Sequence, residues 1–246
     1  MRTRPEDRLS GLVDAAARVF ALKGFRRAQM ADIASELGVS QGLLYRYVES
    51  KEALFYLVID RGSDASPPEE PAKLPILTPE AGAIARRVAE RLRKEAAMPA
   101  LSKALERPQA SDASAELESV VRALYAILYR SAQLITILDR SAPDLPELVA
   151  LFYGRVRGGL VARLARLIEM RAEAGQYRSV PHPGVAARLM VETITWFACH
   201  RRGDPASQDI GDKSAEETTV DFIVHSLVAE STRARLKKPK PPSKQH

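Results

Sequence analysis

The chain has 246 residues, of which 46% are apolar and 28% charged, and its formal net charge is +6. This length allows one large domain or two small ones, and the composition is that of an ordinary globular protein. No apolar run approaches the roughly 20 residues of a membrane-spanning helix, and the N-terminus lacks the apolar core of a secretory signal. A single cysteine, Cys199, excludes an internal disulfide, so we expect a cytoplasmic protein that does not enter a membrane.

The first predicted elements are four helices over residues 5–62. Apolar residues recur at the i, i+3 and i+4 spacing of one helix face: Leu9, Leu12, Val13, Ala16, Val19 and Phe20. Pro5 is a start signal for this helix and Gly24 a stop signal. Residues 25–49 predict two short helices joined by a tight turn, and residues 50–62 predict a further helix capped by Ser50.

The tight turn has the residues of a helix-turn-helix. Gly38 stands where the first helix ends in a left-handed residue, and glycine adopts that conformation without a Cβ penalty. Val39 fills the small core inside the turn, Ser40 is placed to cap the next helix, and Leu44 is its inward residue. Gln41 and its neighbours then point outward, as in motifs whose second helix enters the major groove of DNA.

Beyond residue 62 the pattern changes. Five prolines between residues 63 and 79 exclude a helix and predict a link. Helical apolar stripes follow over residues 117–138, 148–168, 184–201 and 215–230. The sequence therefore predicts an all-α protein with a DNA-binding domain at 1–62 (motif about 29–48), a link at 63–79, a helical regulatory and dimerisation domain at 80–231, and a tail at 232–246.

The net positive charge of the chain is concentrated in the tail. Its last fourteen residues contain six lysines and arginines and no acidic residue, whereas residues 1–62 carry a net charge of only +2. Such a segment buries little apolar area, so we expect it to be disordered. It either adds nonspecific affinity for nucleic acid or serves only solubility.

The residues of this motif resemble those of one known family. Gly-Val-Ser-x-Gly-x-Leu-Tyr-x-Tyr at residues 38–47, followed by Ser-Lys-Glu-Ala-Leu at 50–54, is similar to the TetR family of bacterial transcription regulators. The resemblance covers about residues 8–56. It implies an all-α homodimer with a three-helix DNA-binding head and a variable C-terminal domain that dimerises and often holds a small effector. The implied function is a ligand-responsive repressor that binds double-stranded DNA at a palindromic operator.

Carried over by position, the resemblance implies a set of DNA-binding residues: Gln29, Ser40, Gln41, Gly42, Leu43, Tyr45, Arg46, Tyr47 and Lys51. Gln41 is suited to pair with adenine, and Leu43 to touch a thymine methyl group. Tyr47 and Lys51 are the candidates for phosphate contacts, which position the protein without reading sequence. The alternative for both tyrosines is packing within the head. The chain departs from the family at Gln29, where a threonine is usual, and at Val48, where a phenylalanine is usual.

An effector pocket is the second candidate site. Aromatic and polar residues gather on the C-terminal helices: Tyr125, Tyr129, Phe152, Trp196 and His200. They are suited to line a pocket for an apolar effector, and core packing is the alternative for each. The four histidines show no metal-ligand spacing, and Cys199 and His200 diverge by about 100° on a helix, so we expect neither a metal nor a catalytic pair.

The family resemblance implies that the last two helices, 184–201 and 215–230, form the dimer contact. Residues 148–174 are the alternative. Three glycines on the latter segment, Gly154, Gly158 and Gly159, favour close helix packing, inside the subunit or at the dimer contact, or else a kink.

Two other function classes compete with a regulator. An enzyme is not expected, since the chain lacks a Gly-rich phosphate loop, a Gly-x-Ser-x-Gly elbow and a His-Glu-x-x-His motif, and no cofactor is implied. A helical interaction module with a degenerate helix-turn-helix remains the alternative, because the head is nearly neutral and lacks the family's threonine.

Overall fold

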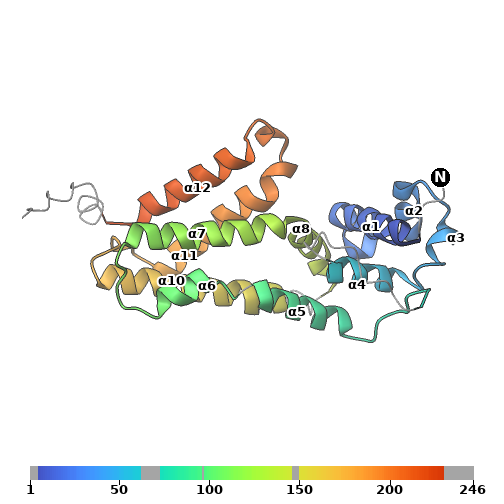
Figure 1. Ribbon diagram of the computed structural model, residues 1–246, viewed down its shortest axis with the longest axis horizontal. Helices are drawn as coiled ribbons and strands as arrows, with labels where there is room; N and C mark the ends of the chain where they lie inside the picture. Colours follow the sequence, from blue (N-terminus) through green and yellow to red (C-terminus); the bar gives the residue numbers. More distant parts are fainter. Residues whose placement is uncertain (1–4, 62–72, 96, 146–149, 230–246) are drawn as a thin grey trace, which may run out of the picture. The chain divides into compact units, whose positions relative to one another are not determined.

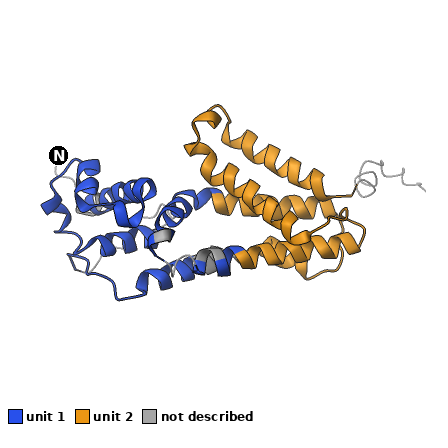
Figure 2. Cartoon of the chain, turned by 180° about the vertical axis from the view of Figure 1, so that it is seen from behind, with its two compact units in different colours: residues 1–96, 129–157 blue, residues 97–128, 158–246 orange. Residues whose placement is uncertain are grey.

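The computed structural model describes residues 5–61, 73–95, 97–145 and 150–229. The predicted tail and residues 63–72 of the predicted link lie outside these ranges. The chain forms two compact units, residues 1–96 with 129–157, and residues 97–128 with 158–246 (Figure 2). The described residues are helical with two isolated β-bridges and no strand, which confirms the all-α prediction.

The first unit contains helices α1 to α5, coloured blue to teal in Figure 1, together with α8 and two short helical segments of other types. They are α1 (Pro5–Arg27), α2 (Met30–Leu37), α3 (Gln41–Leu44), α4 (Lys51–Arg61), α5 (Ala83–Glu95), α8 (Ala132–Ser141), the 3-10 turn η1 (Ala142–Asp144) and the π-helical segment η2 (Ala150–Arg157).

The second unit is built around four longer helices. It contains α6 (Pro99–Leu105), α7 (Ala113–Arg130, whose last two residues belong to the first unit), α10 (Gly158–Glu173), α11 (Pro183–Thr195), the π-helical turn η3 (Trp196–His200), the 3-10 turns η4 (Arg201–Gly203) and η5 (Pro205–Ser207), and α12 (Asp212–Leu227). Each predicted apolar stripe therefore lies on helices, although the stripe at 117–138 is divided between α7 and α8.

A cluster of three phenylalanines holds the N-terminal helices together. The ring of Phe55 on α4 lies 5.0 Å from that of Phe20 in an edge-to-face arrangement, and 4.9 Å from that of Phe25. Phe20 and Phe55 are both completely buried. Such pairs add stabilisation beyond the area that they bury, so this cluster fixes α4 against α1.

A sharp break near the end of α1 brings α8 into the same unit. Gly24 has φ 74° and ψ 169°, a conformation that almost only glycine adopts, so the predicted stop is a break after which three more helical residues follow. A Cβ at Gly24 would lie 2.5 Å from the carbonyl oxygen of Arg140. The next residue, Phe25, donates its N–H to the hydroxyl of Ser141 at 3.1 Å.

The compact units do not follow the predicted division at residues 63–79. Leu134, Ile137 and Leu138 of α8 belong to the same buried core as the N-terminal helices, and partly buried residues of α5 and η2 pack against it. The physical reason is that the helices at 5–61 leave apolar surface that these later segments cover.

The last part of the predicted link is docked on the helix-turn-helix. Ile76 donates its N–H to the carbonyl of Tyr47 at 2.8 Å and accepts the N–H of Glu49 at 2.9 Å. Thr78 donates its N–H to a carboxylate oxygen of Glu49 at 2.7 Å and its hydroxyl to that of Ser50 at 2.8 Å. We call residues 74–78 the strap.

A buried arginine organises one end of the second unit. Arg171 on α10 is completely buried, and its guanidinium donates to both carboxylate oxygens of Glu116, at 2.8 and 3.0 Å. It also donates to the backbone carbonyls of Ala104, Arg107 and Pro108. These bonds join α10, α7 and the segment after α6, since one planar donor group satisfies all of them.

The predicted glycine packing is not seen inside the subunit. An added Cβ at Gly154 or Gly159 would meet no atom within 4 Å, so no other helix of the described chain crosses closely there. The helical geometry changes from π to α between Arg157 and Gly158. A kink at these glycines stays a prediction.

Among the described residues, no single helix is long and apolar enough to cross a membrane; only α7 and α8 taken together, bent by 67° at their junction, meet that length and composition.

Candidate nucleic-acid interface

The start of α2 is stabilised by a carboxylate in its first turn. Asp32 accepts the backbone N–H of Gln29 at 3.0 Å and forms an ion pair with Lys23 at 2.8 Å. The hydrogen bond from Lys23, followed by that from Gln29, lowers the pKa of the Asp32 carboxyl. Asp32 thus supports the helix end at which the family's usual threonine is missing.

The turn between α2 and α3 has the predicted geometry. Gly38 is left-handed, with φ 70° and ψ 33°, and its N–H donates to the carbonyl of Ser35. Val39 is half-buried and donates its N–H to the carbonyl of Ala34. Ser40 occupies the N-cap position of α3, but its side chain makes no capping bond, so that part of the prediction is wrong. Its backbone carbonyl instead accepts the N–H of Leu43 at 3.0 Å.

Four of the predicted DNA-binding residues face solvent on and directly after α3. Gln41, Gly42, Tyr45 and Arg46 are exposed, whereas Leu44 is 1% exposed and anchors α3 in the core as predicted. The amide of Gln41 lies 3.5 Å from the hydroxyl of Tyr45, one helical turn away. The two side chains therefore form one polar face, with donors and acceptors free for a nucleic acid.

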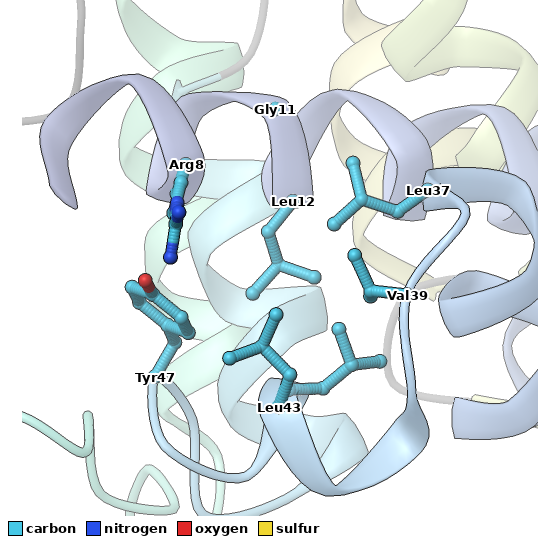
Figure 3. Close-up of a pocket in the computed structure, with 8 residues that line it drawn as sticks. Arg8, Gly11, Leu12, Leu37, Val39, Leu43 and Tyr47 are labelled. Atoms are coloured by element: carbon cyan, nitrogen blue, oxygen red, sulfur yellow. The ribbon is translucent and has the colours of Figure 1, made fainter. Parts of the chain in front are cut away.

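Two other predicted residues are only partly accessible. Leu43 and Tyr47 are half-buried and line a cavity of about 390 Å³ between α1 and the turn. In Figure 3 their side chains lie below α1, with the Tyr47 hydroxyl directed toward Arg8. A packing role and a contact role are compatible for a tyrosine, because the ring packs while the hydroxyl reaches outward.

The ammonium of Lys51 is hydrogen-bonded to the backbone at the end of α1. Its ammonium donates to the carbonyls of Ala28, at 3.1 Å, and Arg26, at 3.4 Å, and lies 4.6 Å from the ring centre of Phe25. A cation at the C-terminal end of a helix is stabilised by the helix dipole and by the free carbonyl groups. The phosphate contact predicted for Lys51 stays a prediction, and this capping role was missed from the sequence.

Glu49 is a second residue that sequence reasoning missed. The backbone N–H of Thr78, followed by the Thr78 side chain, lowers the pKa of the Glu49 carboxyl. The strap thus ends on the residues directly after the outward face of α3. The only signal in the sequence was the short spacing of apolar residues within the proline-rich link.

Three residues of the predicted effector pocket, Tyr125, Trp196 and His200, lie in the second unit. In the second unit, Tyr125 is buried and donates its hydroxyl to the carbonyl of Phe197 at 3.4 Å, and the ring of Trp196 packs edge-to-face on that of Phe197. His200 is half-buried on the same turn as Trp196. Tyr129 belongs to the first unit, and the side chain of Phe152 lies outside the described residues.

Within the described ranges, no group of three histidine, cysteine, aspartate or glutamate side chains is arranged to hold a metal ion. The thiol of Cys199 is buried and lies 3.2 Å from the carbonyl oxygen of Leu128.

The helix-turn-helix corresponds to a known protein family. Residues 12–57 match the family model of bacterial regulatory proteins, tetR family. The N-terminal domain belongs to the tetR family. The chain is also 37% identical over 59 residues to the uncharacterized HTH-type transcriptional regulator YfiR of Bacillus subtilis (strain 168). That match covers only 24% of this chain and 29% of the relative.

Three solved structures share the fold over nearly the whole chain. The ketosteroid transcriptional regulator KstR2 of Mycobacterium tuberculosis is 14% identical, with a TM-score of 0.55 over 91% of this chain and 96% of its own. A tetR-family regulatory protein from Rhodococcus RHA1 is 18% identical, with a TM-score of 0.54 over 93% and 100%. AibR, solved with isovaleryl coenzyme A and operator DNA, is 18% identical, with a TM-score of 0.50 over 87% and 97%.

Proposed function

We propose that this chain is a homodimeric, ligand-responsive transcription repressor that binds a palindromic operator through the helix-turn-helix at residues 29–48. The observation that carries the proposal is the polar face of Gln41 and Tyr45, exposed directly after a left-handed turn at Gly38. In a helix-turn-helix this is the face that meets the base edges of the major groove.

The exposed residues divide into two roles in this proposal. Gln41 reads a base, because its amide offers the donor and acceptor pair that matches adenine in the major groove. Arg46 and the Tyr47 hydroxyl contact phosphates, which set the register of the domain on the duplex. Leu43 is proposed to touch a thymine methyl group, and Ser40 and Lys51 to contact the DNA backbone.

An unpartnered apolar face on the last two helices supports the dimer. Val185 and Leu189 on α11, which are 57% and 63% exposed, lie one turn apart, and Trp196 continues the same face. Phe222 on α12 is 67% exposed. Exposed apolar residues aligned on one helix face, as on α11, mark an interaction surface, and a second copy of the chain matches it in composition.

The effector is proposed to bind in the second unit near Tyr125, Trp196 and His200. The similar regulator AibR was solved with both an acyl coenzyme A and operator DNA, which supports a site for a small molecule on this fold. An effector that binds better to a conformation unable to span two half-sites, about 34–36 Å apart, shifts the population away from DNA.

The deciding experiment is selection of bound sequences from a random duplex pool, repeated with Gln41→Ala and Tyr47→Ala. We expect the unmodified chain to select a palindromic motif. Gln41→Ala should lose the base preference at one base pair in each half-site, whereas Tyr47→Ala should lower the affinity for all sequences alike. Gln208→Ala, which removes an exposed glutamine in the second unit, is the matched control and leaves the motif unchanged.

If no motif is enriched even at low salt, specific DNA binding by the unliganded chain is refuted. The interaction module then becomes the better interpretation, as the occupied ammonium of Lys51 already favours.

A further inference from the structure

The cavity beside α3 has a size and lining that the proposed DNA contacts do not explain. It encloses about 390 Å³ between α1 and the turn, within the roughly 300–1,000 Å³ range of small-molecule sites. All of its lining residues lie between Arg8 and Tyr47 in the first unit, and the predicted effector residues in the second unit take no part in it.

The body of the cavity is aliphatic. Leu12 and Leu44, each 1% exposed, form its buried floor. Leu37, Val39 and Leu43 are half-buried walls, and in Figure 3 the side chains of Leu12, Leu37, Val39 and Leu43 converge on the same space. Such a lining favours the apolar part of a ligand, since it removes hydrocarbon surface from water.

One end of the cavity is polar and basic. Arg8 is exposed there, and Figure 3 shows its guanidinium and the Tyr47 hydroxyl directed toward each other from α1 and from the segment after α3. Among the side chains that the structure describes, no carboxylate forms an ion pair with Arg8. A guanidinium and a phenol together can bind a carboxylate through charge-assisted hydrogen bonds.

We propose that this cavity is a binding site for a medium-chain aliphatic monocarboxylate, with its chain between α1 and the turn and its carboxylate held by Arg8 and Tyr47. The site lies in the DNA-binding head and is separate from the effector site proposed for the second unit.

Such a ligand would compete directly with DNA, a consequence that rests on the proposed function. It occupies Leu43 and the Tyr47 hydroxyl, both of which belong to the proposed DNA contacts. It also places a negative charge at the rim, where a phosphate would approach, and like charges repel. The ligand would then lower the affinity for DNA, and DNA would lower the affinity for the ligand by the same factor.

The test uses the full chain without DNA, so that its outcome is independent of the proposed function. Sodium octanoate is the probe, and leucine methyl resonances report where it binds. We expect the methyl signals of Leu12, Leu37 and Leu43 to shift with a dissociation constant of about 1 mM or lower, as befits so small a ligand.

Two variants separate the parts of the site. Val39→Phe fills the cavity and should abolish the shifts. Arg8→Gln keeps an exposed side chain and should weaken octanoate about tenfold while leaving the binding of 1-octanol unchanged, because only the carboxylate uses the charge. Arg18→Gln is the control on the same helix, since Arg18 is exposed and paired with Glu36 away from the cavity.

Unshifted Leu12, Leu37 and Leu43 signals at millimolar octanoate would overturn the proposal, as would shifts that persist in Val39→Phe. Equal binding of octanoate by Arg8→Gln and the unmodified chain would refute the role of the carboxylate. Shifts that grow with protein concentration alone would instead place a second copy of the chain in the cavity. Failure of DNA binding without octanoate would count only against the proposed function.

Discussion

Thr78 donates its backbone N–H to the carboxylate of Glu49 across 2.7 Å. This bond holds the end of the strap next to Tyr47, since Glu49 follows that residue by two positions. Because Glu49 supplies the acceptor, Glu49→Ala should loosen the strap, including the neighbouring bond from Ile76 to the Tyr47 carbonyl. We expect faster hydrogen exchange at the amides of Thr78 and Ile76, with little change in the unfolding temperature. Glu36→Ala, at another exposed and paired glutamate, should leave both amides as protected as before. Unchanged exchange in Glu49→Ala would contradict this role.

The same bond, with that of Asp32, makes the head sensitive to acid. Both carboxyls have a lowered pKa in the folded chain, Asp32 because of Lys23 and then Gln29, and Glu49 because of Thr78. The unfolded chain therefore takes up protons first, and stability that is complete above the ordinary pKa, about 4, falls as the pH drops through the folded values.

Thermal unfolding followed from pH 6 to pH 2 should show this loss, and the double variant Asp32→Asn with Glu49→Gln should flatten the curve. A variant curve as steep as that of the unmodified chain would assign the acid sensitivity to other carboxylates.

The break at Gly24 predicts a severe effect of a single methyl group. Gly24→Ala places a Cβ 2.5 Å from the Arg140 carbonyl oxygen and forces alanine into a region that almost only glycine adopts. We expect a loss of at least about 2 kcal/mol in the free energy of unfolding, measured with urea.

Gly159→Ala is the matched control, because its Cβ meets no atom within 4 Å on helix α10. It should raise stability by about 1 kcal/mol, since alanine is the better helix former. A destabilised Gly159→Ala dimer with an intact monomer would instead place this glycine at the contact between subunits.

Removal of the buried Arg171 guanidinium should cost far more than removal of an exposed one. Arg171→Met leaves the Glu116 carboxylate and three backbone carbonyls without their donor, so we expect a loss of about 3–5 kcal/mol in urea unfolding. Arg122→Met removes an exposed arginine paired with Glu118 and Glu216 and should cost about 1 kcal/mol or less. Similar losses in the two variants would show that burial does not set the difference.

The apolar face of α11 predicts how the proposed dimer fails. Leu189→Arg introduces a charge where a second copy would bury a leucine, so sedimentation should show monomers at concentrations at which the unmodified chain is dimeric. Leu22→Arg, at a leucine that is 71% exposed in the first unit, should leave the dimer intact. A dimer that survives Leu189→Arg would move the contact to the alternative helix at 148–174.

The local features were predictable because each depends on a few neighbouring residues. The left-handed turn follows from Gly38, the inward position of Leu44 from its spacing, and the cap of α4 from Ser50, whose hydroxyl accepts the N–H of Ala53 at 3.1 Å. The expected Ser40 cap is not formed, since α3 is only one turn long and its backbone bonds suffice.

The missed features join segments that are far apart in the sequence. Nothing near Ser141 indicates that its hydroxyl accepts the N–H of Phe25, and nothing near Thr78 indicates a bond to Glu49. The same holds for the ammonium of Lys51, which the family resemblance assigns to phosphate but which donates to the carbonyls of Arg26 and Ala28, at and just after the end of α1. Tertiary contacts of this kind leave no periodicity and no local motif.

The support of α1 by α8 limits how this protein can be recombined with its relatives. A chimera that exchanges residues 1–62 would separate Gly24 and Phe25 from the Arg140 and Ser141 groups against which they fit. The exchangeable module is therefore discontinuous in the gene, comprising residues 1–96 together with residues 129–157. We expect a chimera that exchanges both segments to keep these contacts. A chimera cut at the link would carry the helix-turn-helix without the α8 residues that pack against α1.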